Sequence, residues 1–212
     1  MKVPLRAMAC VLAAAWSTAG LAQPTNFDAV QIKTTKITST VYMLEGEGGN
    51  IGVSAGEDGV VLIDDQYAPL TPKILAEVKA ISDKPIRFLI NTHWHADQTG
   101  GNENLGRGRV VIVAHDNVYK RLTSEQFVQL LNNRKFPPLS KEGLPLITFN
   151  DTVTFRLNGD EITVHHIPPA HTDGDSIVVF PKAKVVHMGD CFMTISYPFV
   201  DLGSGGSFDG FA

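Results

Sequence analysis

The segment Thr92-His93-Trp94-His95-Ala96-Asp97-Gln98 carries the pattern on which the fold assignment depends. It follows directly on an apolar stretch, Ile86 to Asn91, that is typical of a buried strand. Folds of the α/β class place their functional residues in the loops that follow such strands. Alternate side chains of an extended segment point the same way, so His93, His95 and Asp97 are expected to converge. Imidazole and carboxylate groups are the ligands of catalytic zinc, and we therefore predict a metal site here.

His171 is expected to supply a third imidazole. It stands in Pro168-Pro169-Ala170-His171-Thr172-Asp173-Gly174-Asp175, where two prolines restrict the backbone ahead of a loop. Three histidines and an open coordination position form a known arrangement of catalytic zinc. The chain thus offers a complete ligand set for one zinc ion.

A further ligand is expected where a predicted strand, Lys184 to Met188, ends in Gly189-Asp190-Cys191. Asp190 or Cys191 could bind a second metal ion. Adjacent side chains of an extended backbone point to opposite faces, so only one of the two is expected to face the site.

Strands and helices are predicted to alternate through the chain. Apolar runs indicate strands at Val41 to Glu45, Ile51 to Ala55, Gly59 to Asp64, Ile86 to Asn91, Arg109 to Ala114, Ser176 to Phe180 and Lys184 to Met188. Asn158-Gly159 predicts a hairpin between Asp151 to Leu157 and Glu161 to Ile167, because both turn residues tolerate positive φ.

Three helices are also expected. One starts at Thr71, which can cap it ahead of Pro72, and stops before Lys84-Pro85. Others are predicted near Asp116 and over about Ser124 to Leu131. Strand, helix, strand in this order implies βαβ units, so we predict a mixed α/β fold.

Composition and charge restrict the class of protein. The chain has 212 residues, of which 43% are hydrophobic and 19% charged, as in an ordinary soluble domain. Its net charge of −4 argues against a nucleic-acid partner, which would favour a basic excess. We expect a small-molecule substrate instead.

The first residues have the pattern of a secretory signal peptide. Lys2 and Arg6 precede an apolar run, Ala7 to Leu21, and small residues lead to a cleavage position after Ala22. The run is too short to span a bilayer comfortably, so no stable membrane anchor is expected. We predict a signal peptide at 1–22, a single domain at 23–212, and a secreted or periplasmic protein.

These motifs together resemble the metallo-β-lactamase superfamily. His93, His95 and Asp97 match its His-x-His-x-Asp-His motif, and His171 and Asp190 match two later motifs in the right order. The resemblance covers roughly Val41 to the end of the chain. It implies a four-layer αβ/βα sandwich with a two-zinc site, and its spacing favours Asp190 over Cys191 as the ligand.

Two departures concern the second zinc ion. The motif's sixth position is Gln98 rather than histidine, and a glutamine amide is a poor zinc ligand. The family's final histidine, which follows further strands and a helix, has no match before Ala212. We therefore expect a domain incomplete at its C-terminus, with one firm zinc site on His93, His95 and His171 and a weaker second site on Asp97 and Asp190.

The function implied is hydrolysis. Zinc lowers the pKa of bound water to about 7, and the resulting hydroxide attacks an amide, ester, thioester or lactone carbonyl. Asp97 would orient the nucleophile and carry its proton. Two alternatives remain open: a β-lactamase acting on β-lactam antibiotics, and a degenerate or fragmentary member that binds zinc without catalysis.

Other polar residues are given structural roles. His115, His165, His166 and His187 lie in or beside predicted strands and are not expected to be ligands. Asp64 ends an apolar strand, where it either orients a ligand histidine or forms a turn.

Overall fold

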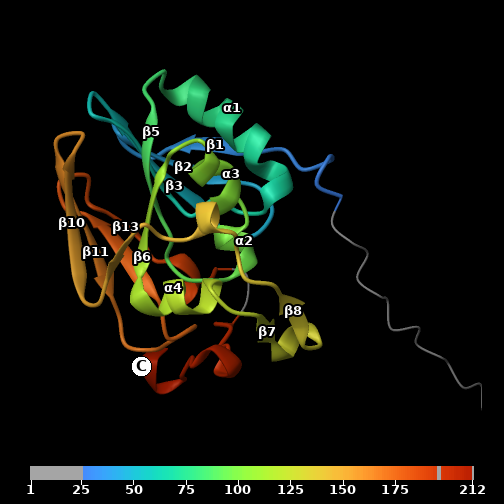
Figure 1. Cartoon of the computed structure of the whole chain (residues 1–212). Helices are drawn as coiled ribbons and strands as arrows, with labels where there is room; N and C mark the ends of the chain where they lie inside the picture. Colours follow the sequence, from blue (N-terminus) through green and yellow to red (C-terminus); the bar gives the residue numbers. More distant parts are fainter. Residues whose placement is uncertain (1–25, 195–196, 212) are drawn as a thin grey trace, which may run out of the picture.

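A computed structural model describes residues 26–194 and 197–211 (Figure 1). The predicted signal peptide at 1–22 lies outside the described residues. Within them, no helix has the length and hydropathy needed to cross a bilayer.

Seven strands form the first sheet, in the order β1-β2-β3-β4-β5-β6-β9. Strands β1 to β4 pair antiparallel, whereas β4, β5, β6 and β9 run parallel. The strands are β1 (Lys33–Lys36), β2 (Val41–Glu45), β3 (Ile51–Gly56), β4 (Gly59–Ile63), β5 (Ile86–Ile90), β6 (Val111–His115) and β9 (Ile147–Phe149). The predicted βαβ units are present, because parallel neighbours require crossover connections.

The helices occupy those connections. They are α1 (Thr71–Ile81), α2 (Ala96–Thr99), α3 (Asn102–Arg107) and α4 (Asp116–Leu122). Short 3-10 turns are η1 (Ala68–Leu70), η2 (Gln129–Leu131), η3 (Lys141–Gly143), η4 (Gly189–Cys191), η5 (Leu202–Ser204) and η6 (Asp209–Phe211). The expected cap at Thr71 is not formed: Thr71 is already helical, because η1 runs directly into α1, and Leu70 is the N-cap.

Four antiparallel strands make the second sheet: β10 (Thr152–Leu157), β11 (Asp160–His166), β12 (Ser176–Phe180) and β13 (Val185–His187). The predicted hairpin turn joins β10 to β11, with φ of 54° at Asn158 and 74° at Gly159. The Asn158 side chain also donates to Ser54 Oγ and the Gly59 carbonyl, at 3.1 and 3.0 Å. The turn therefore ties the second sheet to the first.

The helix expected over about Ser124 to Leu131 is wrong. The chain forms instead a small hairpin of β7 (Gln126–Val128) and β8 (Arg134–Phe136), which stands apart from both sheets in Figure 1. Asn132 and Asn133 both adopt a φ of 55°, which reverses the chain between the strands. Asparagine tolerates this left-handed conformation, and a helix of about eight residues has little stability of its own.

Two apolar cores define the layers. One lies between the first sheet and α1, where Val60, Leu62 and Leu89 meet Ile74 and Val78. The other lies between the sheets; its buried residues are Val41, Val61, Ile63, Ile90, Val113, Phe149, Phe155, Ile162, Val164, Val178 and Phe180. In the part of the chain that the structure describes, the helices and the two sheets form three of the four predicted layers, and the mixed α/β sandwich is confirmed.

A pair of stacked histidines packs outside these cores. The rings of His115 and His166 lie 3.7 Å apart and nearly parallel, at 8°. His115 Nδ1 accepts from the Asn117 N–H at 3.2 Å and caps α4, as a neutral imidazole can. Burial lowers the pKa of His115, and the neighbouring His166 lowers it further.

This lowered pKa makes stability depend on pH. Above the ordinary histidine pKa of about 6.5 both folded and unfolded chains hold His115 neutral; below it the unfolded chain takes up a proton more readily. Stability should therefore fall as pH drops through about 6.5. His115→Asn keeps a good capping residue and removes the titration. Urea unfolding should show a smaller loss between neutral and mildly acidic pH in this variant; an equal loss would contradict the assignment.

Candidate metal centre

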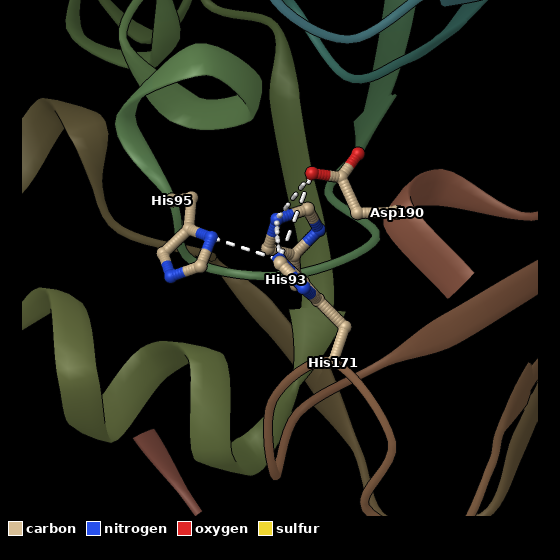
Figure 2. Close-up of side chains that lie close together, drawn as sticks. All are labelled: His93, His95, His171 and Asp190. Atoms are coloured by element: carbon tan, nitrogen blue, oxygen red, sulfur yellow. Dashed lines mark hydrogen bonds and ion pairs between the residues drawn. The ribbon is translucent and has the colours of Figure 1, made fainter. Parts of the chain in front are cut away.

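Three buried imidazoles converge at one end of the sheets. His93 and His95 lie on the loop between β5 and α2, and His171 on the loop between β11 and β12. His171 Nε2 lies 3.2 Å from His93 Nε2 and 2.9 Å from His95 Nδ1 (Figure 2). The structure thus brings together the three histidines predicted as ligands, two of them neighbours in sequence and the third far away.

Asp190 completes this group and Cys191 does not. Asp190 Oδ2 lies 3.9 Å from His93 Nε2 and 3.6 Å from His171 Nε2. The two residues lie on the turn η4 rather than on an extended strand, after Gly189 with φ of 52°. Burial and Asp175 raise the pKa of the Cys191 thiol, so the thiolate that binds metal is disfavoured. His93, His95, His171 and Asp190 are called the ligand cluster below.

His93 is oriented by a chain of hydrogen bonds from β4. Its Nδ1 lies 3.1 Å from Thr92 Oγ1, which donates to Asp64 Oδ2 at 2.7 Å. Asp64 Oδ1 also accepts from the Thr92 N–H at 2.8 Å. Because the Thr92 hydroxyl proton goes to Asp64, its oxygen accepts from His93 Nδ1–H. Asp64 therefore acts on a ligand histidine, one of its two expected roles.

His95 is oriented by Asp201, which sequence analysis missed. Asp201 Oδ2 lies 2.9 Å from His95 Nε2 and accepts from Ser204 Oγ at 2.6 Å. Ser204 in turn accepts from Trp94 Nε1 at 3.0 Å. Burial alone would raise the pKa of Asp201, but the hydrogen bonds from His95 and Ser204 lower it, so the residue is a carboxylate. Asp201, Gly203 and Ser204 are residue types typical of a turn. The sequence around Asp201 therefore gives no signal of a contact with His95.

The third histidine completes the pattern. His171 Nδ1–H donates to the Phe199 carbonyl at 2.7 Å. Burial lowers the pKa of both His93 and His171, and the neighbouring imidazoles lower it further. Each ligand histidine therefore uses one ring nitrogen for an outer partner and turns the other, as a lone pair, toward the same point.

The residues fit a bound metal ion. Lone pairs of three imidazoles repel one another unless a cation lies between them. The ligand atoms of the cluster all lie within 4.8 Å of one another. Imidazoles whose second nitrogen donates to a carboxylate, hydroxyl or carbonyl are the usual ligands of zinc, and a carboxylate is a further one. The ligand cluster could therefore hold one metal ion.

Asp97, also predicted as a ligand, lies beside the cluster rather than in it. Because α2 begins at Ala96, Asp97 is helical and not extended. Its Oδ2 accepts from Gln98 Nε2 at 3.1 Å, and the same nitrogen lies 3.2 Å from Asp190 Oδ1. Burial raises the pKa of Asp190 to about 7, and the Asp97 carboxylate contributes to this shift.

Comparison with known proteins shows the family of this chain. The family model described as the metallo-beta-lactamase superfamily matches residues 44–212. The chain belongs to this superfamily.

Solved structures of metallo-beta-lactamases share the fold. One from Cronobacter sakazakii has a TM-score of 0.67 at 18% identity, covering 85% of this chain and 71% of that chain. One from Pontibacter korlensis has a TM-score of 0.62 at 24% identity, covering 78% of this chain and 74% of that chain. The Cronobacter protein is described by a HARLDQ motif, which ends in Asp-Gln as the segment His93 to Gln98 does.

Two curated relatives match this chain over only part of their own length. A linear primary-alkylsulfatase of a Pseudomonas species is 24% identical over 162 residues, which are 61% of this chain and 30% of the relative. The alpha subunit of a 2,4-dinitroanisole O-demethylase of a Nocardioides species is 22% identical over 141 residues. These are 66% of this chain and 40% of the relative. The chain thus spans well under half the length of either.

The role given to Asp201 can be tested by metal affinity. Removing an outer partner of a ligand histidine typically weakens metal binding by about 10- to 100-fold. Asp201→Ala should do so for zinc, measured by competition with a chromogenic chelator. Asp209→Ala removes an exposed acid from the same segment and should leave the affinity unchanged. Equal affinities in both variants would contradict the role of Asp201.

Proposed function

We propose that this protein is a secreted zinc-dependent hydrolase that cleaves a carbonyl substrate: an amide, ester, thioester or lactone. The observation that carries the proposal is the convergence of three imidazole lone pairs, each fixed by an outer hydrogen bond of the other ring nitrogen. The predicted signal peptide at 1–22 supports export.

Zinc bound here would supply an activated water and polarise the substrate carbonyl. His93, His95 and His171 would hold the ion, and their outer partners would keep the imidazoles neutral and fixed. Asp190 would add a carboxylate at the edge of the cluster. Asp97, tied to Asp190 through Gln98, would accept a proton from the nucleophilic water and return it to the leaving group.

A cavity beside the cluster is suited to a small amphiphilic substrate. It has a volume of about 280 Å³. His95, Asp97 and Asp190 form its inner wall, and the rest is largely apolar: Tyr67, Ala96, Val128, Leu131, Arg134, Phe136, Met193 and Phe199. Much of this outer wall comes from the β7–β8 hairpin. The hairpin would therefore set the shape of the substrate that is accepted.

The proposed zinc site can be removed with one substitution. His95→Ala takes away one imidazole and the group that Asp201 orients, so bound zinc and turnover should both be lost. Zinc per chain is measured by mass spectrometry of the element, and turnover with a panel of ester, thioester and lactone substrates and the β-lactam nitrocefin. His165→Ala, on β11, should retain zinc and activity. Turnover by His95→Ala without bound zinc would refute the proposal.

A second candidate substrate is an alkyl sulfate ester, favoured by one feature of the cavity. Arg134, on β8, lies over the Phe136 ring at 5.3 Å, and both line the apolar wall. A guanidinium on an apolar wall suits an anionic head group joined to an apolar chain. The distant likeness to an alkylsulfatase points to the same kind of substrate.

Arg134→Ala tests whether the substrate is anionic. The KM for anionic substrates should rise by about tenfold or more, as expected when a charge-assisted hydrogen bond is lost. The KM for matched neutral esters should stay the same, as should kcat for both. Lys135→Ala, which removes the neighbouring exposed cation, is the control. Equal effects on neutral and anionic substrates would contradict this role of Arg134.

A further inference from the structure

Gln98 lies between Asp97 and Asp190, two carboxylates that match the family's second metal site. Its Nε2 donates to Asp97 Oδ2 at 3.1 Å and to Asp190 Oδ1 at 3.2 Å. An amide NH2 group has two protons to donate, one for each carboxylate. The nitrogen thus occupies the position that a cation bound by both acids would take.

We propose that the Gln98 amide replaces the second metal ion, so that the protein binds one zinc ion and Gln98 positions Asp190 toward it. This inference rests on the proposed function, because it assumes that the ligand cluster binds zinc.

The Gln98 side chain is buried at the inner end of a cavity that Gly48, Gly49 and Asp190 also line. It is 1% exposed. A Cβ on Gly49 would clash with Nε2, and one on Gly48 would lie 2.6 Å from Asp97 Cβ. The glycine loop between β2 and β3 therefore closes over the amide, and only residues without side chains fit there. The Gln98 backbone is held as well, since its carbonyl accepts from the Asp65 N–H at 3.0 Å.

The two carboxylate oxygens of Asp190 have different contacts. Oδ1 accepts from Gln98, while Oδ2 faces His93 and His171 at 3.9 and 3.6 Å (Figure 2). The amide therefore fixes the rotation of the carboxylate and directs Oδ2 toward the histidines.

The alternative to this arrangement is a Gln98 side-chain amide rotated by half a turn. Gln98 Oε1 is buried and has no hydrogen-bond partner among the described residues. Turning the amide over would direct Oε1 at the two carboxylates, which is favourable only with a cation between them. In that case Gln98 would be a ligand, and the protein would bind two ions. Metal stoichiometry therefore distinguishes the two arrangements.

The first experiment measures zinc per chain in the wild type, by native mass spectrometry after equilibration with excess zinc and removal of free metal. One ion is expected. His171→Ala should lose it and Asp97→Ala should keep it, which assigns the ion to the ligand cluster. Two bound ions, or one ion that depends on Asp97 rather than His171, would overturn the inference about Gln98 but leave the proposed function standing. No bound ion would refute the proposed function, and this inference with it.

The second experiment changes Gln98 itself. Gln98→Glu has nearly the same shape but puts a third carboxylate oxygen where the amide nitrogen was, so the folded variant should bind a second zinc ion. Gln98→Ala removes the contact with Asp190 without adding a ligand. It should still bind one ion, with affinity lower by about 10- to 100-fold, as for other outer partners.

Circular dichroism of the metal-free proteins shows whether each Gln98 variant folds. A folded Gln98→Glu protein that still holds one ion, or a Gln98→Ala protein with unchanged zinc affinity, would overturn the inference. If neither variant folds, the wild-type stoichiometry decides it.

Discussion

The structure depends on keeping three buried, neutral imidazoles side by side. Each has two ring nitrogens, and a buried nitrogen without a partner costs free energy. His93, His95 and His171 meet this requirement with Thr92, Asp201 and the Phe199 carbonyl. The remaining three lone pairs repel one another, so the same arrangement that satisfies the outer nitrogens creates a site for a cation.

The outer partners connect distant parts of the fold to this one point. Asp64 follows directly on β4 and has a φ of 64°. Its carboxylate accepts a hydrogen bond from Thr92, which lies in the loop after β5. Asp201 and Phe199 come from the segment after β13, on the other side of the cluster. The site therefore forms only when both sheets and this last segment are in place. Asp64 and Asp201 contribute through the histidines, not through contact with the metal position.

The negative charges of Asp97 and Asp190 are compensated by a different kind of contact. Asp97 and Asp190 lie half-buried on either side of Gln98, where two negative charges are unfavourable without compensation. In the family's two-metal pattern a cation provides it; here the Gln98 amide donates to both. A single difference from the motif thus alters the electrostatics around Asp97 and Asp190. Both acids also line the substrate cavity.

Sequence alone determined the features that depend on local pattern. Most strands of both sheets, α1 and the Asn158-Gly159 turn follow from apolar periodicity and turn chemistry, whereas the polar edge strand β1 and the short β9 were not predicted. Motif spacing singled out His93, His95, His171 and Asp190. Asp97 was assigned as a ligand because an extended backbone was assumed, whereas α2 begins one residue earlier. The β7–β8 hairpin was predicted as a helix, because two asparagines in left-handed conformation leave little trace in a short amphipathic stretch.

Only the tertiary structure decided which side chains meet. The contact between Asp201 and His95 spans 106 residues and that between Gln98 and Asp190 spans 92. Whether a carboxylate orients a histidine, binds a metal or accepts from an amide is set by distances of a few ångströms. Those distances arise when the sheets pack together, so no local sequence pattern contains them.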